Sequence, residues 1–276
     1  TTGAGCCCIF LSGTTGAGGS GIFIKEHTEK PKIVEKTKER VEISKGIMPL
    51  DELKKAVSLI EVTDEFPFKK ALSEEDISII AEVKRASPSK GLIAEDFDYI
   101  TIAKEYEDAG ASAISVLTEP YFFKGSDDYL KEIANEVSIP VLRKDFVVDE
   151  YMIWEAKLLG ASAVLLIVSI LDVVQLKKYL DLAHDLGLSA IVEAHDGAEI
   201  IGVNNRNLKD FTVDIENSIN LRRCVSGDVI FISESGIKTH EDIARLKEND
   251  VDAVLIGETL MKCDDKKAMI SELKNG

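Results

Sequence analysis

The sequence has few residues of the kinds that hold metals or cross-link a chain, and it lacks any long hydrophobic run. Of its 276 residues, five are cysteine and four are histidine, and they show no CxxC, zinc-ligand or HExxH spacing. No apolar stretch approaches the ~20 residues of a membrane-spanning helix. We therefore expect reduced thiols in a cytoplasmic protein, with no metal site and no membrane partner.

Basic residues are also in deficit. The 33 Lys and Arg against 49 Asp and Glu give a net charge of −16, which argues against nucleic acid or an anionic membrane surface as a partner. An anionic small-molecule substrate would need cations placed locally. Prolines number only six, and no low-complexity linker follows residue 31. The chain therefore fits one large domain of α/β-barrel size, as a monomer or weak homo-oligomer.

The first 31 residues form a glycine-rich segment unlike the rest of the chain. They contain Gly16, Gly18 and Gly21 at GxGxxG spacing, which in another context indicates a dinucleotide-binding loop. That loop needs a strand before it and a helix after it, whereas Pro31 soon follows and would interrupt a helix. We interpret residues 1–31 as an appendage and residues 32–276 as a single barrel domain.

From about Ile33 onward, short apolar stretches alternate with amphipathic ones. Continuous apolar runs rich in Val and Ile are typical of buried parallel strands. We expect eight, at residues 77–83, 113–117, 139–142, 163–168, 189–193, 200–204, 229–233 and 253–257. Helices are expected at residues 33–44, 50–60, 99–109, 127–136, 150–159, 172–186, 216–224 and 240–247. We expect left-handed glycines in the turns after four helices, at Gly110, Gly160, Gly187 and Gly227. This alternation predicts a (βα)8 TIM barrel with an N-terminal helical extension.

One connection is too short for this fold. Only Ala194 to Ala198 lie between the fifth predicted strand and the start of the sixth near Glu199, whereas a parallel crossover needs a dozen or more residues. Five extended residues reach at most ~17 Å. The sequence predicts either a crossover helix missing near Asp196 and Gly197, which we favour, or a hairpin there that inverts the sixth strand.

Charged and polar residues stand at the carboxyl ends of the predicted strands, where barrels of this type collect their functional groups. Glu82 and Lys84 are two residues apart, so they share one face of the first strand. The other candidates at strand ends are Lys144, Glu193, Asn204, Arg206, Glu234, Ser235, Gly236 and Gly257. Taken singly, a charged residue there is usually solvated or ion-paired, and a glycine is usually a tight turn. Together, the charges can shift pKa values toward acid–base use, and the glycines lie where barrels often bind phosphate.

Seven runs in succession resemble those of the indole-3-glycerol phosphate synthases. They are IIAEVKRASPSKG, SVLTEPYFFKGS, VLRKDF, IVEAHD, IGVNNRNL, ISESGIK and VLIGETLM. The resemblance extends from about Ile33 to the C-terminus. It implies a barrel of the ribulose-phosphate-binding type that acts in tryptophan biosynthesis without a metal or organic cofactor. The implied reaction is ring closure, decarboxylation and dehydration of 1-(2-carboxyphenylamino)-1-deoxyribulose 5-phosphate to indole-3-glycerol phosphate.

The resemblance also implies roles for the matching residues. Lys144 would be the general acid of ring closure, and lysine suits acid–base work because burial readily lowers its pKa. Glu193 would be the base of the dehydration. Lys84 would pair with the substrate carboxylate, oriented by Glu82. The remaining implied contacts are Asn204 with substrate hydroxyls, Ser235 beside Glu234 at the reacting end, Ser87, Arg206, Gly236 and Gly257 around the phosphate, and Pro88, Phe123 and Phe146 around the aromatic ring. Leu208 is implied as a further substrate- or phosphate-binding residue.

Two alternatives stay open at this point. One is another phosphate-binding barrel, such as a phosphoribosylanthranilate isomerase, whose cysteine–aspartate pair would require a Cys that no predicted strand end here supplies. The other is a truncated or catalytically disabled barrel that lacks its fifth crossover helix.

Overall fold

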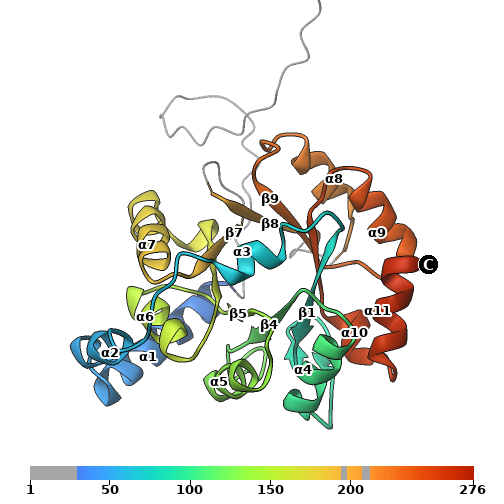
Figure 1. Cartoon of the computed structure of the whole chain (residues 1–276). Coiled ribbons are helices and arrows are strands. Elements are labelled where there is room, and N and C mark those ends of the chain that lie inside the picture. Colours follow the sequence, from blue (N-terminus) through green and yellow to red (C-terminus); the bar gives the residue numbers. More distant parts are fainter. Residues whose placement is uncertain (1–29, 194–197, 207–211) are drawn as a thin grey trace, which may run out of the picture.

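Eight parallel strands close into a barrel surrounded by helices (Figure 1), in a computed structural model that describes residues 30–193, 198–206 and 212–276. Hydrogen-bonded neighbours follow the order β1-β10-β9-β8-β7-β6-β5-β4 around the barrel. The predicted TIM barrel is therefore confirmed. The strands are β1 (Ser78–Val83), β4 (Ala113–Leu117), β5 (Val141–Lys144), β6 (Ala163–Ile167), β7 (Ser189–Glu193), β8 (Ile200–Asn204), β9 (Ile230–Glu234) and β10 (Ala253–Ile256).

The predicted helices are all present, with ends that differ from the expected ones by at most a few residues. They are α1 (Lys30–Ile47), α2 (Leu50–Val57), α4 (Tyr99–Asp108), α5 (Asp127–Glu136), α6 (Glu150–Leu158), α7 (Val173–Asp185), α8 (Glu216–Arg222) and α9 (His240–Lys247). Pro31 lies in the first turn of α1, where a missing N–H costs nothing. The sequence reasoning missed α3 (Pro67–Ala71), the 3-10 helix η1 (Val168–Ile170), α10 (Glu258–Lys262), α11 (Lys266–Asn275) and the small hairpin of β2 (Ala86–Ser87) and β3 (Gly91–Leu92).

Three of the four expected left-handed glycines follow helix ends as predicted. Gly110, Gly160 and Gly187 have φ values of 84°, 88° and 68°, which glycine adopts without steric penalty. The prediction was wrong at Gly227, which is not among the glycines with positive φ. Helix α8 ends earlier, at Arg222, so Gly227 does not follow its last turn directly.

Alternating strand residues build two apolar layers. Inward-facing side chains such as Ile80, Leu142 and Ile191 fill the barrel, and Phe68 and Leu72, from α3 and the residue that caps it, belong to the same buried cluster. Since α3 directly precedes β1, it packs at the amino end of the barrel and leaves the carboxyl end open. The outward-facing residues form a second cluster with the helices. A packed interior with one open mouth is the usual arrangement of this fold.

The short connection joins two strands that do run parallel. Ile191 of β7 pairs with Ile200 of β8, and Glu193 pairs with Gly202. The hairpin alternative, which would invert β8, is therefore wrong. Within the described ranges, no helix lies between β7 and β8. Residues 194–197, where we predict a missing segment, lie outside the described residues, as do the GxGxxG glycines and the rest of the predicted appendage up to residue 29.

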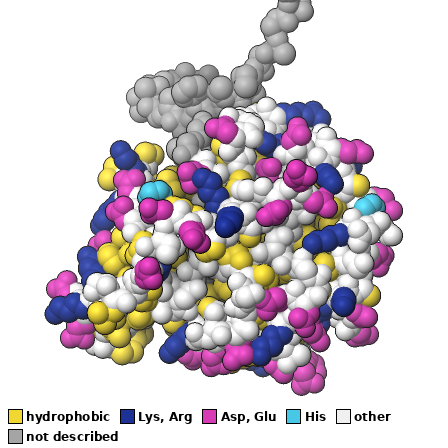
Figure 2. All heavy atoms as spheres, viewed as in Figure 1, with side chains coloured by type: hydrophobic (Ala, Val, Ile, Leu, Met, Phe, Trp, Pro, Cys, Tyr) yellow, Lys and Arg dark blue, Asp and Glu magenta, His cyan; other side chains and the backbone are white. Residues whose placement is uncertain are grey.

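The face seen in Figure 2 carries acidic and basic side chains interspersed with one another. The charge of −16 is thus not gathered there into a single acidic patch. Among the described helices, none is long and apolar enough to cross a bilayer.

Candidate active site

A cavity of about 870 Å³ opens at the carboxyl ends of the barrel strands. Fourteen of the fifteen candidate residues line it, from Glu82 on β1 to Gly257 after β10. The fifteenth, Leu208, lies outside the described residues. Asn204 and Arg206 line the same cavity as Glu193, because β8 keeps its parallel direction after the shortened crossover. The strand-end rule therefore predicted correctly that these residues meet in one cavity, and their roles in binding and catalysis stay predictions.

Glu82 and Lys84 both face this cavity, as their spacing of two residues predicts, and they form an ion pair there. The Lys84 Nζ donates a hydrogen bond to Glu82 Oε1, and Glu82 is almost fully buried. Burial by itself would raise the pKa of Glu82, but the charges of Lys84, Lys144 and Arg206 and the hydrogen bond from Lys84 lower it on balance. Glu82 is therefore a carboxylate at neutral pH.

The structure explains why position 257 is a glycine, which the sequence did not reveal. A Cβ atom at this position would collide with Glu82 Oε1 and lie 2.8 Å from Lys84 Nζ. Glycine thus gives the ion pair room against the end of β10. Its expected contact with a phosphate stays a prediction.

Lys144 and Glu234 form a second ion pair across the mouth of the barrel. Lys144 ends β5, Glu234 ends β9, and Lys144 Nζ donates a hydrogen bond to Glu234 Oε2. Burial favours the neutral amine, yet the carboxylates of Glu234, Glu82 and Glu193 outweigh it and raise the pKa of Lys144 above its ordinary value. The direction expected from burial alone was thus wrong, and Lys144 is protonated in the free protein.

The other carboxylate oxygen of Glu234 has no hydrogen-bond donor among the described residues. This atom, Oε1, is buried, and it lies 2.6 Å from where a Cβ of residue 202 would stand. Gly202 on β8 therefore leaves space for the Glu234 side chain. A buried acceptor beside a protonated lysine can accept a hydrogen bond from a bound molecule.

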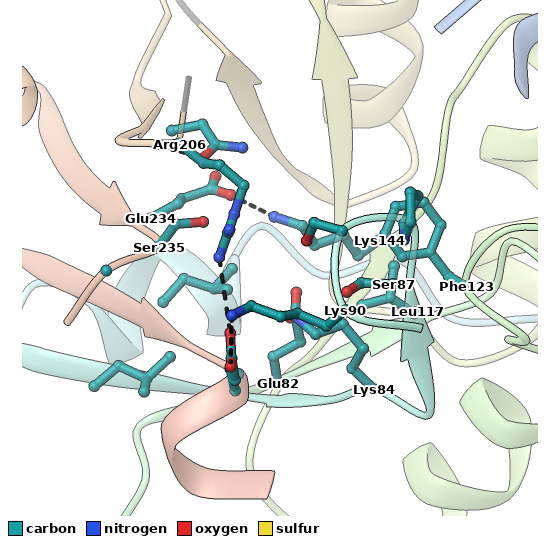
Figure 3. Close-up of a pocket in the computed structure, with 18 of the residues that line it drawn as sticks. Glu82, Lys84, Ser87, Lys90, Leu117, Phe123, Lys144, Arg206, Glu234 and Ser235 are labelled. Carbon is teal, nitrogen blue, oxygen red and sulfur yellow. Dashed lines mark hydrogen bonds and ion pairs between the residues drawn. The ribbon is translucent and has the colours of Figure 1, made fainter. Parts of the chain in front are cut away.

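The two sides of the cavity differ in character. Phe123 and Phe146 lie with their ring centroids 6.3 Å apart and form an apolar wall. Arg206 and Ser235 lie on the opposite side, with Lys144 between the two walls (Figure 3). Such a cavity suits a ligand with an aromatic end and an anionic end.

The N-terminal helix contributes to the site in a way that the sequence did not indicate. Ile33 of α1 lines the cavity. Arg40 of the same helix donates a 2.7 Å hydrogen bond to the buried carboxylate of Asp145, which also accepts one from Thr118. Asp145 directly follows Lys144, so α1 braces the segment that carries the lysine. No local pattern links residues this far apart in the sequence.

Four further charged residues that line the cavity were also missed. They are Lys90, Lys238, Glu258 and Lys262. Lys90 had a signal that could have found it, because it lies only two residues after Pro88 in the same loop. In the parts of the chain that the structure describes, no group of three or more His, Cys, Asp or Glu side chains could hold a metal ion.

Comparison with known proteins identifies one family over nearly the whole described chain. Residues 30–273 match the family model for indole-3-glycerol phosphate synthase. A protein of that name from Lachnoclostridium phytofermentans is 52% identical, over 88% of this chain and 98% of its own length. Another from Ruminiclostridium cellulolyticum is 53% identical, over 88% of this chain and 97% of its own.

Solved structures resemble the chain in fold. A 3-hexulose-6-phosphate synthase from Salmonella typhimurium has a TM-score of 0.59 at 14% identity, covering 72% of this chain and 97% of that one. A tryptophan synthase α-subunit from Pyrococcus furiosus has a TM-score of 0.55 at 15% identity, covering 72% and 98%. At such identities the likeness concerns the barrel alone.

Proposed function

The chain belongs to the indole-3-glycerol phosphate synthase family, and from that premise we propose how the residues of its cavity divide the reaction. The enzyme closes a ring in 1-(2-carboxyphenylamino)-1-deoxyribulose 5-phosphate, then removes carbon dioxide and water to form indole-3-glycerol phosphate. Each of these steps moves a proton at a defined position.

Lys144 is the general acid that protonates the substrate carbonyl as the new carbon–carbon bond forms. The observation that carries this role is its position inside the cavity beside Glu234, where the carboxylates of Glu234, Glu82 and Glu193 keep the amine protonated. A general acid must hold its proton at the working pH and lie within reach of the reacting oxygen. The charge of Lys144 also helps to bind an anionic substrate in a protein that is acidic overall.

Glu193 is the base of the dehydration, and Glu82 has an orienting role. Glu82 is bound by Lys84, and its pKa is lowered by surrounding cations, so it is a weak base that fixes the position of the lysine. Lys84 pairs with the carboxylate that the reaction releases as carbon dioxide. Glu193 lines the same cavity from the end of β7.

The substrate lies with its aromatic ring against Phe123, Phe146 and Pro88, and with its phosphate near Arg206 and the Ser235–Gly236 turn. The centroid spacing of the two phenylalanines supports the first contact. The second is supported by the positive φ values of Ser235 and Gly236, 70° and 88°, because successive turn residues of this kind can point their N–H groups at an anion. Asn204 contacts the hydroxyl groups between the two ends.

The direct test is turnover by the full chain. Purified protein mixed with the carboxyphenylamino-deoxyribulose phosphate is expected to produce the fluorescence of the indole product. Folded protein without any signal would favour the disabled barrel, the alternative that the short β7–β8 crossover suggests. Neither the family match nor the cavity supports the phosphoribosylanthranilate isomerase alternative.

Glu234→Gln is expected to move the alkaline limb of the kcat/KM profile to lower pH. The carboxylate of Glu234 is the largest of the influences that raise the pKa of Lys144. Without it that pKa falls, so the lysine loses its proton earlier as the pH rises. The pH dependence of kcat/KM measures the shift.

Glu136→Gln is the matched control for this experiment. Glu136 is also paired with a lysine, Lys104, at 2.5 Å, but it ends α5 and so lies toward the amino end of the barrel. The alkaline limb of the kcat/KM profile of Glu136→Gln should match that of the wild type. A limb that stays in place in Glu234→Gln would assign the alkaline ionisation to another group.

A further inference from the structure

The carboxylate of Glu258 lies among three cations at the mouth of the cavity. Its Oε1 atom is 2.8 Å from Lys262 Nζ and 3.5 Å from Lys90 Nζ. Its Oε2 atom is 3.9 Å from a guanidinium nitrogen of Arg206. All four side chains line the cavity, and Figure 3 shows Lys90 and Arg206 pointing toward one another. The cations come from three separate parts of the chain: the loop after β1, the end of β8, and α10.

The group has more positive than negative charge. Three cations around one carboxylate leave a surplus of two positive charges within the group. A hydrogen bond from Lys262 and the charges of Lys262 and Lys90 lower the pKa of Glu258, against the opposing effect of burial, so it remains negative at neutral pH. The surplus suits a dianion, such as a phosphate ester, better than a second carboxylate.

Lys90 links the loop after β1 to the opposite side of the mouth. It lies between β2 and β3, in the same loop as Ser87 and Pro88, and it reaches Glu258 on α10. Its side chain is 46% exposed, so the pair is at the rim, where an ion pair contributes little stability. Such a weak pair can be exchanged for a stronger anion.

We propose that Glu258 is an internal counter-anion that competes with the phosphate group of the substrate for Lys90, Arg206 and Lys262. Before binding, it holds the three cations together at the mouth. When the substrate binds, its phosphate replaces Glu258 as the partner of these cations. The negative charge of Glu258 then repels the phosphate and limits the affinity of the protein for it. The proposal rests on the phosphate-bearing substrate of the proposed function.

The limit on affinity has a consequence for turnover. Substrate and product carry the same phosphate, so the contact between the phosphate and the three cations stabilises the ground state and the transition state alike. Binding of that uniform kind lowers KM without raising kcat. A counter-anion that weakens it therefore favours product release at little cost to the chemical step.

A calorimetric titration of the full-length protein with inorganic phosphate tests whether Glu258 competes with phosphate. The solution is mildly alkaline, so that phosphate is a dianion. Glu258→Gln removes the competing charge and keeps the side-chain shape, so its Kd should fall about three- to tenfold. Lys90→Gln should raise the Kd. Glu136→Gln, which removes a lysine-paired carboxylate far from the mouth, should leave the Kd at the wild-type value and so controls for net charge.

The opposite results overturn the proposal. A Kd that stays the same or rises in Glu258→Gln would mean that the carboxylate only arranges the cations and does not compete. An unchanged Kd in Lys90→Gln would remove that lysine from the phosphate contact. A fall in Glu136→Gln equal to that in Glu258→Gln would assign the effect to net charge.

Turnover by the same preparations separates this proposal from the proposed function. If the wild-type protein makes product and the Kd for phosphate is unaltered in Glu258→Gln, the competition proposed for Glu258 is wrong and the proposed function stands. If the wild-type protein makes no product but Glu258→Gln binds phosphate more tightly, the proposed function is wrong and the role of Glu258 as a counter-anion is supported.

Discussion

Lys144→Ala is expected to lower kcat/KM by about 10²- to 10⁴-fold, the contribution that a positioned general acid makes. Lys144 is the protonated group at the centre of the cavity, between the aromatic wall and Arg206. Alanine removes both the proton and the charge that balances Glu234. Initial rates from the indole fluorescence measure the loss.

Lys144→Arg separates the proton from the charge. Arginine keeps the positive charge, but its pKa is too high to give up a proton readily, so this variant should be nearly as slow as Lys144→Ala. A rate close to wild type in Lys144→Arg would reduce the role of Lys144 to electrostatic binding. Lys104→Ala removes an exposed lysine that is also paired with a glutamate, and it should keep full activity.

Arg143→Met is expected to lower the free energy of unfolding by about 3 kcal/mol or more. Arg143 is 1% exposed and donates hydrogen bonds to Asp127, Glu155 and the carbonyl oxygen of Met152, at 2.6, 2.7 and 2.8 Å. Methionine fills much of the space but leaves two carboxylates without their cation. Breaking a buried ion pair on one side is strongly destabilising for this reason.

Denaturant unfolding of Arg143→Met and Arg245→Met tests the effect of burial. Arg245 is 56% exposed and pairs with Glu216 at the surface, so its loss should cost at most about 1 kcal/mol. Equal losses in the two variants would contradict the importance of the buried network. Because Arg143 points to the helices and not into the cavity, the folded fraction of Arg143→Met should keep its kcat.

Arg143 and Lys144 illustrate how far the sequence can predict this site. Both directly follow the third predicted strand, residues 139–142, and strand periodicity sends adjacent residues to opposite faces. The sequence alone could not say which of the two faces inward. The structure decides it, since Leu142 packs inside the barrel, Arg143 contacts α5 and α6, and Lys144 reaches Glu234 across the mouth.

The parts that the sequence reasoning missed depend on contacts between distant segments. Arg40 and Asp145 are 105 residues apart, and the cluster around Glu258 joins three separate parts of the chain. The pKa of Lys144 was expected to fall with burial, but it rises because three carboxylates surround it. Coulomb energies depend on distance through space, which the order of residues does not reveal.

By itself, the sequence determined the barrel, the family and the strand ends whose side chains meet in the cavity, because buried parallel strands and capped helices leave periodic patterns among neighbouring residues. It also located the short crossover between β7 and β8. Only the tertiary structure decided the direction of β8, the partners of Glu82 and Lys144, the bracing by α1 and the place of Glu258 among its cations. Those features arise where strands and loops from separate parts of the chain meet, and there the charges of neighbours set the pKa of each group.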